Sequence, residues 1–121
     1  MKFMTIIKGP ELAEQPPQAL MDAIDAFGRD AKQAGVFVEW GGLQPTSDES
    51  RVRSSKGKLV VVDGPFTETK EVIGGYAIYE VASKDVAMDW SRRFMELHAK
   101  HWPEWEGEVE VRGLMFEEQA G

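Results

Sequence analysis

Two kinds of hydrophobic spacing divide the chain into two helices and several short strands. Apolar residues at helical spacing, with charged residues between them, predict helices over residues 18–34 and 84–100. Gly35 is a natural terminator of the first helix, and Ser83 is a natural N-cap of the second. Short apolar runs bounded by Gly, Pro or polar residues predict strands over residues 2–8, 36–40, 72–81 and 108–116.

Residues 51–63 predict a β-hairpin, with Lys56-Gly57 as the turn between strands 51–55 and 58–63. The predicted order is therefore β-α-β, a hairpin, then β-α-β. This order is the split β-α-β, ferredoxin-like plan with an inserted hairpin, in the α+β class. The 121 residues suffice for one core, so we expect a single domain over residues 1–121.

The strand at residues 72–81 is apolar on both sides, which bears on the oligomeric state. Tyr76 and Ile78 point to one side, and Ala77, Tyr79 and Val81 point to the other. Two helices can cover only one face of the sheet, and an exposed apolar face of that size is unusual. We therefore expect a homodimer that packs open sheet face against open sheet face.

Composition and charge narrow the class of protein. The chain carries 21 acidic and 14 basic residues, a net charge of −7, which disfavours binding to nucleic acid. Its apolar stretches are too short to span a bilayer, and the N-terminus lacks the pattern of a signal peptide. The absence of cysteine excludes disulfides, a thiolate nucleophile and cysteine-based metal sites. We expect a cytoplasmic protein that does not bind membranes.

Asp63 is the first candidate for chemistry. It follows Val60, Val61 and Val62, so its carboxylate is expected to be only partly hydrated, as in acids that exchange protons near neutrality. The alternative is structural, because Asp-Gly-Pro also closes a strand by accepting backbone hydrogen bonds. The residues after Asp63 are expected either to contact a substrate or to form a solvated loop. The substrate-contact candidates are Gly64, Pro65, Phe66, Thr67 and Lys70.

Glycine and histidine supply further candidates. Gly74-Gly75 interrupts a strong strand, which indicates a β-bulge, a close crossing by a neighbouring strand, or a gap for a ligand. His98 and His101, three residues apart on the second helix, are candidate general bases. Two histidines near a helix C-terminus also interact favourably with its dipole, and without a third ligand they do not indicate a metal site. We therefore assign no metal and no cofactor.

Large aromatic residues could wall a pocket. Trp40 is expected to border the cleft, and Trp102 and Trp105 to line a pocket or the dimer interface, whereas Trp90 is expected in the core.

The stretch VVDGPFTETKEVIGGYAIYEV (residues 61–81) resembles the signature of DGPF-domain proteins in the YCII-related superfamily. The resemblance extends to MKFMTIIK, AGVFVEWGGLQP and ELHAKHWPEWEGEVEVRG, and so covers nearly the whole chain. It implies a dimeric α+β barrel of ferredoxin-like fold, with the DGPF carboxylate in a cleft. It also implies a function that is largely uncharacterised, with some members linked to extracytoplasmic-function sigma-factor systems. Classical members carry a His–Asp pair with the histidine on the first helix, but residues 18–34 contain no histidine.

Two functions follow as hypotheses. The first is a homodimer that binds a small organic molecule, or an enzyme in which Asp63, with His98 or His101, performs an elimination, isomerisation or lyase-type step. The second is a non-catalytic interaction module that binds a sigma-factor-type regulator. The two differ in whether Asp63 and a histidine converge in one pocket.

Overall fold

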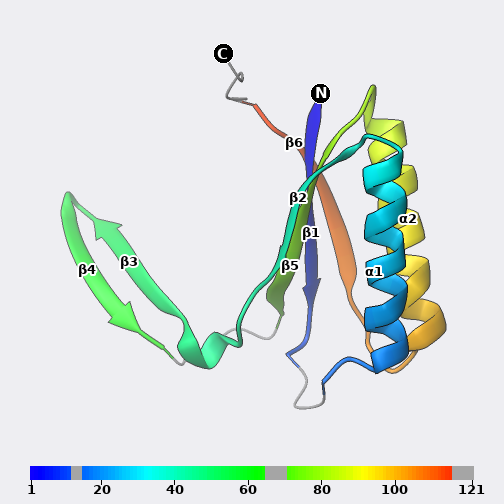
Figure 1. Ribbon diagram of the computed structural model, residues 1–121. Helices are drawn as coiled ribbons and strands as arrows, with labels where there is room; N and C mark the ends of the chain where they lie inside the picture. Colours follow the sequence, from blue (N-terminus) through cyan, green and yellow to red (C-terminus); the bar gives the residue numbers. More distant parts are fainter. Residues whose placement is uncertain (12–14, 65–70, 116–121) are drawn as a thin grey trace.

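The computed structural model describes residues 1–11, 15–64 and 71–115 and shows an α+β fold (Figure 1). The elements are β1 (Lys2–Gly9), α1 (Gln18–Gln33), β2 (Phe37–Gly42), the 3-10 turn η1 (Thr46–Asp48), β3 (Ser50–Ser55), β4 (Lys58–Asp63), β5 (Val72–Glu80), α2 (Lys84–His101) and β6 (Glu108–Gly113). The predicted bounds agree within two residues, except that the last strand ends at Gly113 rather than at residue 116.

Four of the strands form one antiparallel sheet in the order β2-β5-β1-β6. This is the order of two split β-α-β units, in which the strands of each unit are separated by a strand of the other. Both helices lie on the same side of the sheet (Figure 1). The predicted α+β class and split β-α-β order are therefore confirmed.

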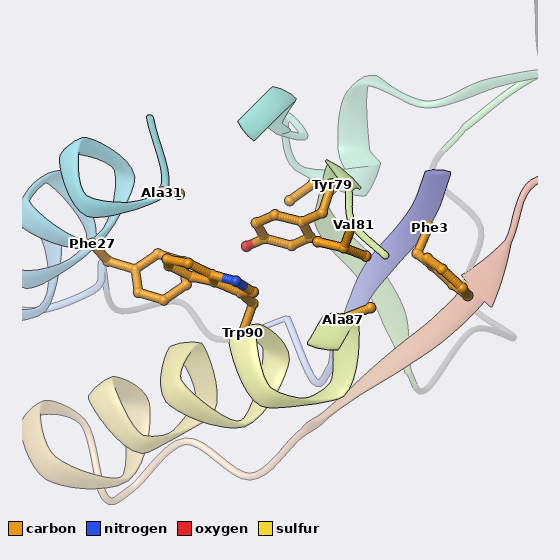
Figure 2. Close-up of a cluster of buried hydrophobic side chains, with 8 residues drawn as sticks. Phe3, Phe27, Ala31, Tyr79, Val81, Ala87 and Trp90 are labelled. Carbon is orange, nitrogen blue, oxygen red and sulfur yellow. The ribbon is translucent and has the colours of Figure 1, made fainter. Parts of the chain in front are cut away.

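The core lies between the helices and the sheet. It consists of Phe3, Phe27, Ala31, Ala77, Tyr79, Val81, Ala87 and Trp90. Figure 2 shows the ring of Tyr79 beside that of Trp90, with centroids 6.2 Å apart, and Phe27 meets Trp90 edge-on at 5.6 Å. The guanidinium of Arg93 lies 4.3 Å from the Trp90 ring, so a cation–π contact closes this end of the core. Trp90 is a core residue, as predicted.

The start of α2 and the end of α1 are each set by a residue that commonly caps helices. The Ser83 hydroxyl accepts a hydrogen bond from the backbone N–H of Val86 at 3.4 Å and caps α2. Gly35, with φ of +74°, provides the left-handed residue that ends α1. Both predicted helix boundaries are confirmed.

The glycine pair of β5 marks both a bulge and a close crossing. The register shifts because Ile7 pairs with Gly75 whereas Lys8 pairs with Ile73, which leaves Gly74 as the extra residue. A Cβ at Gly75 would lie 2.9 Å from the carbonyl oxygen of Gly41 on β2, so only glycine fits there.

Strands β3 and β4 pair only with each other within the described residues and form a two-stranded hairpin, here called the arm (residues 50–63). Its turn is Lys56-Gly57, with positive φ angles of 53° and 78°, the signature of a type I′ turn. Figure 1 shows the arm projecting on the side of the sheet opposite the helices.

The sheet face away from the helices, here called the open face, is apolar at its centre. Met4 pairs with Ile78, and Ile6 pairs with Tyr76. Charged groups flank this centre: the Lys8 ammonium lies 2.8 Å from the Glu110 carboxylate, and the Tyr76 hydroxyl donates to Glu39 at 2.6 Å. An apolar centre with a polar rim is typical of protein interfaces.

Candidate functional site

A cavity of about 540 Å³ lies between the sheet and the two helices, at the end where α2 finishes. Residues of β1, β2, β5, α1 and α2 line it, together with the segment after α2. Aromatic residues supply much of its wall; these are Trp40, Tyr76, Tyr79, Phe94, Trp102 and Trp105. Its size and apolar lining are typical of small-molecule sites.

His98 is the titratable group that α2 contributes to this cavity. It is 8% exposed and lies between the rings of Phe94 and Trp105, with centroid distances of 4.8 and 4.9 Å. Burial lowers the pKa of His98, and the hydrogen bond to the Phe94 backbone opposes this only in part. The side chain is therefore a neutral imidazole at pH 7.

The hydrogen bond of His98 fixes which nitrogen carries the proton. Its Nδ1 lies 3.1 Å from the carbonyl oxygen of Phe94, and a carbonyl can only accept. Nδ1 therefore donates, and the lone pair of the neutral ring is on Nε2.

Nε2 of His98 faces the cavity. Within residues 1–11, 15–64 and 71–115, Nε2 has no hydrogen-bond partner. Every fully buried side-chain nitrogen or oxygen in those residues does have a partner, so Nε2 is not fully buried. Nε2 is consequently reachable, and His98 is otherwise enclosed by protein and lines the cavity. The site presents a hydrogen-bond acceptor that is also a base.

The hydroxyl of Tyr79 supplies a donor by the same reasoning. The ring is 2% exposed, and the described part of the chain offers its hydroxyl no partner. Burial raises the pKa of Tyr79 to about 12, against the opposing charge of Arg93, so the phenol keeps its proton at neutral pH. One donor and one acceptor, both uncharged, thus meet an aromatic cavity.

Glu11 and Asp25 are the charged groups among the described residues that line the cavity. Both are exposed, and the Glu11 carboxylate accepts the backbone N–H of Thr46 at 3.1 Å. No Lys or Arg of residues 1–11, 15–64 and 71–115 lines the cavity. The site is therefore suited to neutral or cationic molecules, and a carboxylate or phosphate would find no compensating charge.

Two glycines that the sequence reasoning missed allow the indoles to take these positions. A Cβ at Gly28, inside α1, would lie 2.5 Å from Cη2 of Trp40. A Cβ at Gly9 would lie 2.8 Å from Cζ2 of Trp105. Gly28 carried a signal, because glycine within a helical pattern costs about 1 kcal/mol relative to alanine and usually has a packing reason.

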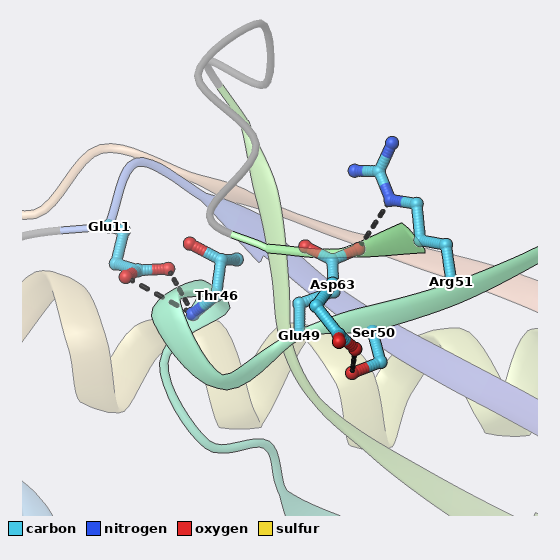
Figure 3. A network of polar contacts seen from close by, with 6 residues as sticks. All are labelled: Glu11, Thr46, Glu49, Ser50, Arg51 and Asp63. Carbon is cyan, nitrogen blue, oxygen red and sulfur yellow. Dashed lines mark hydrogen bonds and ion pairs between the residues drawn. The ribbon is translucent and has the colours of Figure 1, made fainter. Parts of the chain in front are cut away.

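Asp63 lies at the base of the arm rather than in the cavity. Its Oδ1 accepts a hydrogen bond from the Ser50 hydroxyl at 2.7 Å, and the side chain is exposed. Figure 3 shows Asp63 in a polar cluster in which Arg51 donates to Glu49 at 2.9 Å. The expected partial dehydration of Asp63 is wrong for the single chain, because Val60 and Val61 belong to the projecting arm and are themselves exposed.

The remaining predicted residues are placed as follows. Trp40 and His98 both line the cavity, as do Gly74, Gly75, Trp102 and Trp105, but Asp63 is not among the described residues that do. His101, half-buried in the last turn of α2, also lies outside the lining. Gly64 donates its N–H to the Glu49 carbonyl at 2.6 Å and helps to close the arm. Pro65, Phe66, Thr67 and Lys70 lie outside the described residues.

The described part of the chain holds neither a metal-ligand cluster nor a membrane-spanning helix. There, no three His, Asp or Glu side chains come close enough to hold a metal ion. Neither of the helices described is long and apolar enough to cross a membrane.

Comparison with known proteins finds a family and a relative. The YCII-related domain matches residues 1–106. The chain is also similar to the uncharacterized protein R00369 of Rhizobium meliloti (strain 1021), with 34% identity over 80 residues. The alignment covers 66% of this chain and 64% of that protein, so the chain spans a little under two thirds of its relative.

Proposed function

The chain belongs to the family of YCII-related domains, and we propose that it is a cytoplasmic homodimer that binds a small organic molecule in the cavity beside His98. The observation that carries the proposal is the pairing of an acceptor, His98 Nε2, with a donor, the Tyr79 hydroxyl, in one aromatic cavity. A few polar groups in an apolar pocket are the usual means of fixing a ligand's orientation.

The ligand class follows from the charges of the lining. A neutral molecule with a flat apolar part would stack on the indoles and bond to His98 and Tyr79. A cation would also be accepted, since Glu11 and Asp25 lie at the cavity. A carboxylate would be buried without a counter-ion, which disfavours binding.

If the site is catalytic, His98 is the base. Its lowered pKa keeps it unprotonated at pH 7, so Nε2 can accept a proton from a carbon or hydroxyl of the ligand. Tyr79, still protonated, donates a hydrogen bond to the oxygen on which charge develops. This is the proton transfer that an elimination, isomerisation or lyase-type step needs.

The chain leads from Asp63 directly to the wall of the cavity. β4 ends at Asp63 and β5 begins at Val72, which lines the cavity, so the DGPF signature joins the base of the arm to the cavity wall. We propose that Asp63 acts at the entrance to the site, and that Gly64, Pro65, Phe66, Thr67 and Lys70 contact the ligand as the sequence predicts.

The apolar centre of the open face is the reason to propose a homodimer. Met4, Ile6, Tyr76 and Ile78 form an apolar centre that the helices of the same chain do not cover. Packing two such faces together would give the dimeric α+β barrel implied by the resemblance and remove these side chains from water.

Calorimetric titration with three naphthalene compounds tests the function: 2-naphthalenemethanol, 2-naphthalenemethanamine and 2-naphthoate. The alcohol and the amine are expected to bind, and the naphthoate at least tenfold more weakly. Tyr79→Phe and His98→Gln are each expected to weaken binding of the alcohol about fivefold or more. Ser91→Ala, which removes a buried hydroxyl of α2, and His101→Gln are matched controls outside the cavity lining and should leave binding unchanged. Equal binding of all three compounds, or equal effects of control and test variants, would refute the proposal.

The second candidate, a regulatory module, is favoured by the exposed apolar side chains of the arm. It predicts that a purified sigma-factor-type regulator binds with an affinity that Asp63→Asn does not change. A cavity that binds none of the three compounds, together with such an interaction, would favour this alternative.

A further inference from the structure

The arm lacks the support that a two-stranded hairpin needs. In the described residues its strands pair only with each other, and a single hairpin is at best marginally stable in water. Additional strands or a packed layer normally supply the missing stability. The described residues of the single chain therefore do not supply the layer that would hold the arm.

One face of the arm is apolar. Residues directly opposite in an antiparallel pair lie on the same face, so Val52 and Val61 share a face, and Leu59 lies on it two residues from Val61. These three side chains are 68%, 68% and 73% exposed. They form a continuous apolar surface.

The other face and the turn are basic. Arg53 lies opposite Val60 on that face, Lys58 also lies there, and Lys56 is in the turn. Residues 50–63 contain four basic residues and one acidic residue, a formal charge of +3. Since the chain carries −7, the remaining residues carry −10. The arm and the body of this protein are therefore complementary in charge.

The position of the arm matches this complementarity. Figure 1 shows it reaching away from the sheet on the side of the open face, opposite the helices. A second copy packed against the open face would lie on the same side as the arm.

We infer that the arm clasps a second copy of this chain: as two open faces pack together, each arm lies against the partner and covers Val52, Leu59 and Val61. This inference rests on the proposed homodimer and adds a second, separate contact to it. Hydrophobic burial holds the apolar face of the arm against the partner. The basic residues lie on the opposite face and in the turn, and the net charge of +3 that they give the arm attracts the acidic body of the partner at longer range.

Substitution of the arm and measurement of the dimer dissociation constant by sedimentation test the inference. Val61→Lys and Leu59→Lys are expected to raise that constant at least tenfold, because a charge would be placed in an apolar contact. Met88→Lys makes a comparable change at an exposed methionine of α2 and should have little effect. Raising the salt concentration should weaken the wild-type dimer.

Ile78→Lys, on the open face, separates failure of the clasp from failure of the dimer. A dimer lost in Ile78→Lys but unchanged in Val61→Lys and Leu59→Lys would overturn the clasp and keep the sheet interface. A monomeric wild-type protein, or a dimer unaffected by Ile78→Lys, would overturn the proposed homodimer and the clasp with it.

Hydrogen exchange of the arm gives a second readout that does not depend on substitution. The clasp predicts that the amides of β3 and β4 become protected as the protein concentration rises through the dissociation constant. Fast exchange of these amides at every concentration would contradict it, as would protection independent of concentration, which another occupant or intrinsic stability would produce.

Discussion

The indole of Trp40 occupies the space that a side chain at Gly28 would need: a Cβ there would lie 2.5 Å from Cη2 of the indole. This relationship joins β2 to α1 and sets one wall of the cavity. Gly28 is buried within α1, where glycine lowers helix stability. Glycine at position 28 is therefore explained by the packing of Trp40 against α1.

Gly28→Ala is expected to lower the free energy of unfolding by about 1 kcal/mol or more, although alanine favours helix, because Trp40 must move. Urea denaturation measures the change. In the double variant Gly28→Ala/Trp40→Phe the smaller ring relieves the clash, so the two effects should not add. A Gly28→Ala protein more stable than wild type would contradict this packing.

Gly74 and Gly75 are adjacent but differ in what surrounds them. Gly75→Ala places a Cβ 2.9 Å from the Gly41 carbonyl oxygen, so a loss of about 1–3 kcal/mol is expected in urea denaturation. Gly74→Ala meets no atom within 4 Å and is the matched control for stability. Because Gly74 lines the cavity, its alanine variant should bind 2-naphthalenemethanol more weakly while keeping its stability.

The pKa of His98 predicts a dependence of stability on pH. Burial lowers the folded-state pKa, so below pH 6.5 the unfolded chain binds a proton that the folded chain does not yet bind. The free energy of unfolding should therefore fall as pH decreases from 6.5 toward the folded-state pKa of His98, by at most about 1.4 kcal/mol per pH unit. NMR titration of the His98 ring measures that pKa directly.

Trp105→Ala serves as the comparison, since it removes the ring 4.9 Å from His98 and admits water. The pKa of His98 should then move back toward 6.5. An unchanged His98 pKa in Trp105→Ala would show that this ring is not what keeps water from the imidazole.

Asp63→Asn separates the structural role of Asp63 from a functional one. Its hydrogen bond to Ser50 is exposed, so Asp63→Asn and Ser50→Ala should each cost less than about 1 kcal/mol in unfolding free energy. Ser50→Ala removes the same bond and keeps the carboxylate. If Asp63 acts at the entrance to the site, only Asp63→Asn weakens binding of 2-naphthalenemethanamine; unfolding of Asp63→Asn would instead make Asp63 a structural residue.

The order of elements along the chain and the helix positions could be predicted because hydrophobic spacing, Ser83 and Gly35 act locally. The cavity could be predicted only in part. Trp40 and the Gly74-Gly75 pair were identified as candidates, but Tyr79 was assigned only to one side of its strand. Its position depends on which face of β5 meets the helices and on how far α2 stands from the sheet, and both are tertiary facts.

The separation of Asp63 from His98 also lay beyond the sequence. The run Val60–Val62 predicted that the Asp63 carboxylate would be only partly hydrated, as in a cleft. In the structure the arm pairs with no strand of the main sheet, so the same run projects into solvent. Hydrophobic spacing identifies a strand but not the sheet to which it belongs.

The central claim, that the cavity beside His98 is a ligand site, is tested most directly by NMR of the four tryptophan indole N–H groups. Trp40, Trp102 and Trp105 line the cavity, whereas Trp90 lies in the core and is an internal control. Addition of 2-naphthalenemethanol is predicted to shift the three cavity signals and leave that of Trp90 least changed. Four unchanged signals, or a shift confined to Trp90, would contradict the account.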